Sequence, residues 1–225
     1  MSMDVFYNLL EKLESLGIAL SIAAWLTVLL GSLGLILLLR RERSSSSRIW
    51  RSASIIGVMA LAANLTDYFV TFHRSPDLYL EVNPIWRNVI DTWGITVAWW
   101  YGFSGKILLS LVAGLMAAVY LTRRDRLYPE RAASFFDFMR RMGERSRSWR
   151  DRLSNLFTVF CFFFAGIQLF CFYIAFLNWR VDFETDPRVP PVLPALVLTL
   201  LVIGAAFLIL TSRAFQKHIA RGRTP

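Results

Sequence analysis

The chain is poor in residues that bind metals or form disulfides, with two cysteines and two histidines among 225 residues. Cys161 and Cys171 are separated by about 15 Å along one predicted helix, too far for a bond between them. They are most simply buried apolar side chains. A disulfide framework and a cysteine-type metal site are therefore excluded. His73 and His218 fall on opposite sides of the predicted membrane, which argues against a bis-histidine haem.

Motifs of common enzyme classes are missing as well. The sequence contains no G-x-S-x-G, H-E-x-x-H or Walker-type pattern. A metal site built from Asp67, His73 and Glu81 would require the helix to end before His73, because that residue is rotated about 240° from Asp67. We therefore predict no metal and no cofactor.

Apolar residues make up 56% of the chain and are gathered in long blocks. A helix of roughly 20 apolar residues crosses a bilayer. Five blocks meet this criterion: residues 16–39, 51–73, 97–121, 154–178 and 192–212. Because exposed loops and sheet edges are not tolerated in lipid, we predict an all-α polytopic membrane protein, with residues 1–225 as a single integral membrane domain.

The net charge of +9 follows the predicted topology. Residues 40–51, the loop 122–152 and the tail after 212 hold 19 of the 25 Lys and Arg, while the opposite segments hold nine acids. This alternation satisfies the positive-inside rule, with the N-terminus outside and the C-terminus in the cytoplasm. We therefore reject nucleic acid as a partner. No cleaved signal or transit peptide is apparent, so a prokaryotic plasma membrane is the default location.

Two segments outside the spans have the composition of interfacial helices. Residues 3–15 place their apolar side chains on one helical face, although a simple extension of the first span is the alternative. The basic cytoplasmic loop 122–152 mixes Phe, Met and Trp with arginine around residues 132–149, which suits a helix lying on anionic lipid headgroups. A loop that is basic for topology alone explains the same charges.

Polar residues follow one face of the second span. Residues three and four apart share a helix face. Along this face of the second span, the side chains are small in the cytoplasmic half and polar in the outer half, where Asn64, Asp67 and Thr71 lie. Polar residues within membrane helices normally face protein. An ionised Asp67, roughly 10 Å from the outer end of the helix, therefore needs a partner.

The third span supplies that partner in Lys106, which we place at a matching depth. Lys106 is the only lysine and Asp67 the only acid within the five spans. We predict that the two side chains face one another, directly or through water. Snorkelling of Lys106 toward the outer surface is the competing interpretation.

The segment Glu81-Val82-Asn83-Pro84 follows the polar stripe. Pro84 restricts Asn83 to non-helical geometry, and an Asn-Pro pair favours a turn. The outer loop can thus fold back and place Glu81 and Asn83 over the Asp67–Lys106 pair. The alternative is a solvated turn in which Asn83 caps the next helix.

The whole pattern is similar to that of a family of small prokaryotic membrane proteins of unknown function. It comprises N-x-x-D-x-x-x-T at Asn64 to Thr71, E-x-N-P at Glu81 to Pro84, and the helical Lys106. The resemblance implies a shared polar site, but the family implies no assigned chemistry.

Three functions are compatible with this pattern. We favour a non-catalytic membrane protein, a subunit or assembly scaffold of a larger complex, in which the polar cluster fixes helix packing. The alternative is a small transporter or binding protein that uses the cluster for a proton, an ion or a small polar molecule. The third is an intramembrane enzyme with Asp67 or Glu81 as acid or base. Expected partners are anionic lipids and other membrane proteins.

Overall fold

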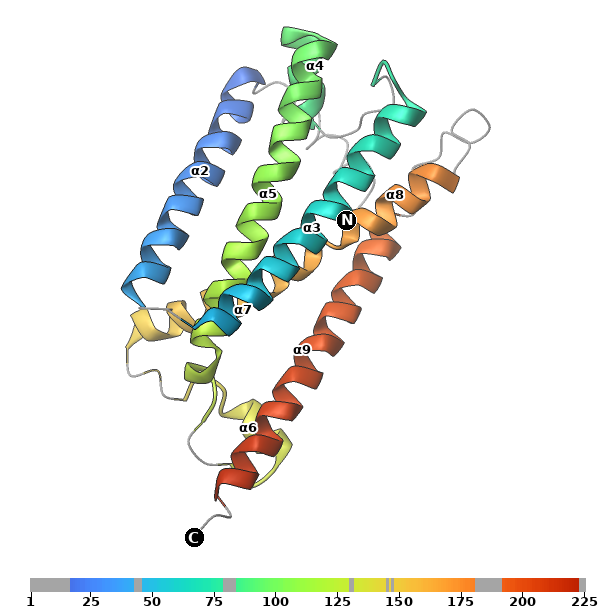
Figure 1. Ribbon diagram of the computed structural model, residues 1–225. Helices are drawn as coiled ribbons and strands as arrows, with labels where there is room; N and C mark the ends of the chain where they lie inside the picture. Colours follow the sequence, from blue (N-terminus) through green and yellow to red (C-terminus); the bar gives the residue numbers. More distant parts are fainter. Residues whose placement is uncertain are drawn as a thin grey trace.

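The computed structural model describes residues 17–42, 46–78, 84–129, 132–144, 146, 148–180 and 192–222, whose regular structure is entirely helical. Figure 1 shows the arrangement of these helices. They are α2 (Gly17–Arg41), α3 (Ser47–Arg74), α4 (Pro84–Trp93), α5 (Ile95–Arg123), the 3-10 turn η1 (Arg124–Arg126), α6 (Phe135–Arg140), α7 (Trp149–Ile167), α8 (Phe170–Arg180) and α9 (Val192–Gly222).

Within the described residues, four helical segments are long and apolar enough to cross a membrane: Ser47–Arg74, Ile95–Arg126, Trp149–Ala175 and Leu196–Lys217. They coincide with four of the predicted spans, so the all-α class is confirmed and the chain is consistent with a multi-pass integral membrane protein. Helix α2 covers the predicted span 16–39 but is not among the four. The fifth crossing and the sidedness of the termini remain predictions, and the predicted helix 3–15 lies outside the described residues.

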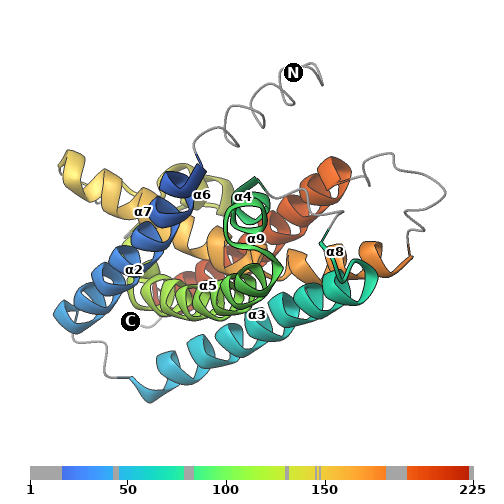
Figure 2. The ribbon, with the colours of Figure 1, turned by 90° about the horizontal axis from the view of Figure 1, so that it is seen from above.

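Helix α5 is the centre of the bundle, and it packs against α2, α3, α4 and α7. Helix α8 packs on α3, while α9 covers α7 and α8. Figure 2 shows α3 and α5 running side by side. We call the end formed by α6, η1 and the start of α7 the arginine-rich end. The end formed by α4 and the start of α5 is the opposite end.

Helices α3 and α5 approach each other closely at a point where both carry small residues. A Cβ atom placed on Gly57 would lie 3.5 Å from the Cα of Gly114, and the reverse distance is the same. Ala53, Ala60 and Ala113 are buried nearby. Small residues allow membrane helices to approach closely, so the small half of the predicted α3 stripe packs on α5.

Two segments differ from the sequence-based interpretation. The predicted span 154–178 begins earlier, at Trp149, and is interrupted between α7 and α8 by a turn at Gln168 and Leu169. The predicted outer loop 74–96 contains helix α4, which begins at Pro84. Proline at the first helical position sacrifices no intrahelical hydrogen bond.

The predicted basic loop 122–152 is also largely structured at its ends. Helix α5 continues to Arg123, and Ser148 starts α7 with a capping box in which its side chain and Asp151 satisfy each other's backbone N–H groups. Such boxes satisfy two N–H groups that the helix cannot bond itself. At the C-terminus, α9 extends past the predicted end at 212 to Gly222.

Candidate functional site

The candidate site is built on the buried face of α3. Asn64 is 1% exposed and Asp67 is 9% exposed. They lie three residues apart, which places both on the side of α3 that faces α5. Both were predicted as members of a polar cluster from this spacing.

Lys106 on α5 reaches Asp67 directly. The Lys106 Nζ lies 2.6 Å from the Asp67 Oδ2, and both side chains are largely buried. The predicted contact is therefore confirmed. Removing one member of such a pair leaves an uncompensated charge, which costs about 3–5 kcal/mol in buried pairs. The contact thus strongly disfavours arrangements in which α3 and α5 separate or slide.

Asn64 joins three segments one turn along α3. Its Nδ2 lies 2.9 Å from the Ala60 carbonyl oxygen, 3.3 Å from the Ser110 Oγ and 3.3 Å from the Gln168 Oε1. The Cys171 thiol donates to the Asn64 Oδ1 at 3.3 Å. An amide has two N–H groups, so the three acceptors share two hydrogens. We call Asn64, Asp67, Lys106, Ser110, Gln168 and Cys171 the polar cluster of the structure.

Ser110, Gln168 and Cys171 are members of the cluster that were not predicted. Cys171 was interpreted as a buried apolar side chain and Gln168 was assigned to no site, whereas both side chains bond Asn64. The interruption between α7 and α8 explains their position, because Gln168 sits in the turn itself. The signal in the sequence was that Gln168 is an amide residue near the middle of a predicted span.

The turn after α7 is locally stabilised. The Leu169 N–H donates to the Gly166 carbonyl at 3.1 Å, and the Phe172 N–H donates to the Leu169 carbonyl at 3.2 Å. These bonds replace part of the regular α-helical pattern. A Cβ atom placed on Gly166 would lie 3.1 Å from the Ile203 side chain, which shows that α7 packs closely on α9 at this glycine. The interruption is thus held from both sides, by α3 and by α9.

The remaining predicted members are not brought into the cluster by the described contacts. Thr71 lies one turn beyond Asp67, is partly buried, and accepts the Ser75 N–H through its carbonyl at 2.9 Å. Glu81 and Asn83 fall outside the described residues, so the predicted cap over the pair remains a prediction. His73 is exposed at the end of α3.

An aromatic layer closes the opposite end of the bundle beside the ion pair. The Trp86 ring from α4 lies on Gly102, where an added Cβ would come within 2.1 Å of the ring. The Trp86 indole N–H donates to the Ala98 carbonyl at 2.8 Å, and the Tyr68 hydroxyl donates to the Trp99 carbonyl at 3.0 Å. These bonds satisfy the polar atoms of two buried aromatic side chains.

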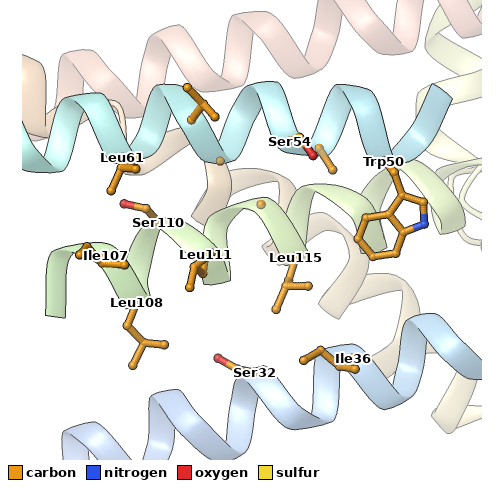
Figure 3. Close-up of a pocket in the computed structure, with 14 residues that line it drawn as sticks. Ser32, Ile36, Trp50, Ser54, Leu61, Ile107, Leu108, Ser110, Leu111 and Leu115 are labelled. Atoms are coloured by element: carbon orange, nitrogen blue, oxygen red, sulfur yellow. The ribbon is translucent and has the colours of Figure 1, made fainter. Parts of the chain in front are cut away.

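A groove of about 510 Å³ runs between α2, α3 and α5, as Figure 3 shows. Its lining is mainly apolar, with three serines, Ser32, Ser54 and Ser110. Ser110 also accepts a hydrogen bond from Asn64. The groove therefore reaches the polar cluster at one residue.

A second group of charges joins three helices at the arginine-rich end. Glu42 accepts hydrogen bonds from Arg123 Nη2 at 2.7 Å and Nε at 3.2 Å, and it is also paired with Arg126. Arg123 Nη1 donates to the Ser154 Oγ at 3.0 Å. Burial alone would raise the pKa of Glu42, but the two arginines outweigh that effect and hold the pKa below its ordinary value. We call Glu42, Arg123, Arg126 and Ser154 the arginine clamp.

No model of a known protein family matches the chain, and no curated protein or solved structure matches it either. The resemblance to the N-x-x-D-x-x-x-T family therefore remains a prediction.

Proposed function

We propose that the chain is a non-catalytic integral membrane protein that serves as a subunit or assembly scaffold of a membrane complex. In this role the polar cluster holds α3, α5 and the α7–α8 turn in one arrangement. The observation that carries the proposal is the buried Lys106–Asp67 contact at 2.6 Å, together with the four groups around the adjacent Asn64.

The chemistry of the cluster supports a packing role. Within the described residues, each contact of Asn64 other than that with Ala60 goes to α5 or to the α7–α8 segment. Buried polar networks of this kind can specify a helix arrangement even where they add little net stability. A scaffold needs such a fixed arrangement, because its binding surfaces are useful only at a constant relative position.

Isolation from native membranes tests the scaffold role. We expect the tagged chain, extracted in a mild detergent, to co-purify with other membrane proteins at a fixed ratio. The variant Asp67→Ala should lose this association, because the helix arrangement is altered. The matched control is Leu201→Ala, at an exposed position on α9, which should retain it. A wild-type chain that migrates alone, with no component at a fixed ratio, would contradict the proposal.

One observation favours the alternative role in transport or binding. The Asp67 Oδ1 is buried and has no hydrogen-bond partner among the described residues. It lies in the same cluster as a helix interruption, and interrupted helices frame the sites of many secondary transporters. A bound polar molecule or ion would satisfy such an atom, whereas an unsatisfied buried acceptor costs about 1–3 kcal/mol.

Flux measurements separate the two roles. For transport, proteoliposomes carrying the wild type should dissipate an imposed proton or sodium gradient. Asp67→Asn should abolish this flux while remaining folded, and Gly105→Ala, at an open position on α5, should leave it unchanged. If wild-type proteoliposomes retain both gradients as well as empty vesicles do, transport of these ions is ruled out.

For the membrane orientation, we propose a prokaryotic plasma-membrane location with the arginine-rich end in the cytoplasm, which the clustering of arginine there supports. A reporter that is active only in the cytoplasm should be active when fused after Arg123 or after Gly222. A reporter that is active only in the periplasm should be inactive at both points. Periplasmic activity at either point would reverse the orientation.

A further inference from the structure

We propose that the arginine-rich end binds the headgroups of anionic phospholipids through a surface formed by α6 and the first turn of α7. This surface consists of Phe136, Arg140, Trp149, Arg150 and Arg152, and we call it the headgroup surface. The inference requires only that the chain is embedded in a membrane. It is independent of the scaffold role, and its failure would leave that role untouched.

Helix α6 is fixed to the bundle by one of its faces. Phe138 is fully buried, with its ring 5.5 Å from Phe215 of α9 and 5.3 Å from Tyr128. The Phe135 ring lies 5.9 Å from Phe215 as well. Phe215 belongs to the last turns of the membrane-crossing stretch Leu196–Lys217. Helix α6 is therefore held at the level where that stretch ends, as Figure 1 shows for the two helices.

Two large aromatic side chains at this level are not used in packing. Phe136 is 79% exposed on α6, and Trp149 is 67% exposed at the beginning of the membrane-crossing stretch Trp149–Ala175. Large apolar side chains that stay in water lose the favourable free energy of burial. Aromatic residues are enriched at the boundary between lipid and water. Trp149 begins one crossing stretch, and α6, which carries Phe136, packs on the end of another, so both side chains lie near that boundary.

Exposed arginines lie on the same two helices as these aromatic side chains. Arg140 is 68% exposed, and Arg150 and Arg152 are exposed as well. The Arg150 guanidinium lies 5.7 Å from the centre of the Trp149 ring. Guanidinium groups form paired hydrogen bonds with phosphate oxygens.

The nearby acids are already engaged. Asp137 accepts bonds from Arg140 and Arg141 at 2.9 Å each and from the Ala133 N–H, and Asp151 belongs to the α7 capping box. Arg150 and Arg152 form no salt bridge with any residue in the described part of the chain. The headgroup surface therefore combines positive charge with insertable aromatic rings, which favours a lipid surface over a soluble polyanion.

Depth measurements with a nitroxide label test the insertion. In a Cys161→Ala/Cys171→Ser background, labels are placed through Phe136→Cys and, as the matched control, Glu144→Cys in the turn after α6. The probes are vesicles of phosphatidylcholine alone and with phosphatidylglycerol added. We expect the label at 136 to lie about 5–10 Å below the phosphates when phosphatidylglycerol is present and shallower without it, and the label at 144 to remain in water. Equal water exposure at both positions, or no dependence on phosphatidylglycerol, would overturn the proposal.

Lipid retention in native mass spectrometry tests the charges without a label. The triple variant Arg140→Gln/Arg150→Gln/Arg152→Gln should weaken phosphatidylglycerol retention by at least about fivefold at low salt, while phosphatidylcholine retention stays unchanged. The control Arg40→Gln/Arg41→Gln/Arg48→Gln removes the same charge from exposed positions on α2 and α3 and should have a clearly smaller effect. Equal losses of phosphatidylglycerol retention in the two triple variants would show that the lipid binds to the whole arginine-rich end. This result would contradict a specific headgroup surface.

Discussion

Two ion-pair sites, the Lys106–Asp67 pair and the arginine clamp, both join α5 to neighbouring helices but differ in how fully their carboxylates are bonded. Both Glu42 oxygens accept bonds from arginines. Asp67 uses one oxygen for Lys106, and its other oxygen has no hydrogen-bond partner within the described residues. The Glu42 carboxylate is thus hydrogen-bonded through both oxygens, as expected of a structural contact. The Asp67 carboxylate retains one oxygen that can accept a further hydrogen bond.

The sites also differ in their exposure. Arg126 in the clamp is 60% exposed, so part of that interaction is screened by water. Lys106 and Asp67 lie within helices that are long and apolar enough to cross a membrane, where water would not compensate for a lost partner. Ion pairs with similarly short distances can therefore differ in the free energy that is lost when one partner is removed.

Removal of each carboxylate gives the largest expected effects and ranks the two sites. Asp67→Ala should lower the free energy of unfolding by about 3–5 kcal/mol, because Lys106 loses its buried counter-charge. Glu42→Ala should cost about 1–3 kcal/mol, since Arg123 retains Ser154 and Arg126 is hydrated. Unfolding in mixed detergent micelles measures both. A larger loss for Glu42→Ala would reverse the ranking.

Packing beside the Lys106–Asp67 pair gives the next effect. Gly102→Ala should destabilise the chain by about 1–3 kcal/mol, because the new methyl group collides with the Trp86 ring. Gly105→Ala on the same helix meets no atom within 4 Å. This control should be neutral or stabilising by up to about 1 kcal/mol. The melting temperatures of the two variants in one detergent test this prediction. Equal values would show that the Trp86 side chain moves aside without a cost in stability.

A single hydrogen bond in the arginine clamp provides a smaller test. Ser154→Ala should cost about 0.5–1.5 kcal/mol, because Arg123 loses its neutral partner on α7. Ser104→Ala is the control, since the bonds of the Ser104 hydroxyl within the described part of the chain are to carbonyls of its own helix, those of Trp100 and Tyr101. Chemical unfolding of the two variants should therefore differ. If they are equally stable, the link from α5 to α7 contributes nothing measurable.

The pH dependence of the arginine clamp is the smallest expected effect. The pKa of folded Glu42 lies below its ordinary value of 4.5, so its ionised form stabilises the fold above that value. This contribution is lost as the pH falls through the lower, folded-state pKa. Glu42→Gln should thus show a shallower loss of stability below pH 4.5 than the wild type. Parallel curves for the two proteins would mean that Glu42 is not responsible for any of the slope.

Much of the helical architecture could be predicted from the sequence because long apolar blocks allow few structures in lipid. The contact between Asp67 and Lys106 was predictable for the same reason, since Lys106 is the only lysine and Asp67 the only acid in the predicted spans. The partners Gln168 and Cys171 were not, because the interruption between α7 and α8 depends on packing against α3 and α9 rather than on a proline or a local polar run.

Helix α4 and the arginine clamp were missed for different reasons. The segment after Pro84 was interpreted as part of an outer loop, and its short apolar face becomes meaningful only when Trp86 lies on Gly102. Arg123 and Arg126 were counted as topological charges, and sequence alone gave no reason to pair them with Glu42 across α2 and α5. The contact of α4 is with the next helix along the chain, whereas the arginine clamp joins residues 81 positions apart.

A double-mutant cycle on Asp67 and Lys106 tests most directly whether this pair fixes α3 against α5. The free energies of unfolding of Asp67→Ala, Lys106→Ala and the double variant are compared with that of the wild type. We predict a coupling of about 0.5–3 kcal/mol, with the double variant more stable than the sum of the two single losses implies. Strictly additive losses would show that the two side chains do not stabilise one another, and would contradict the account.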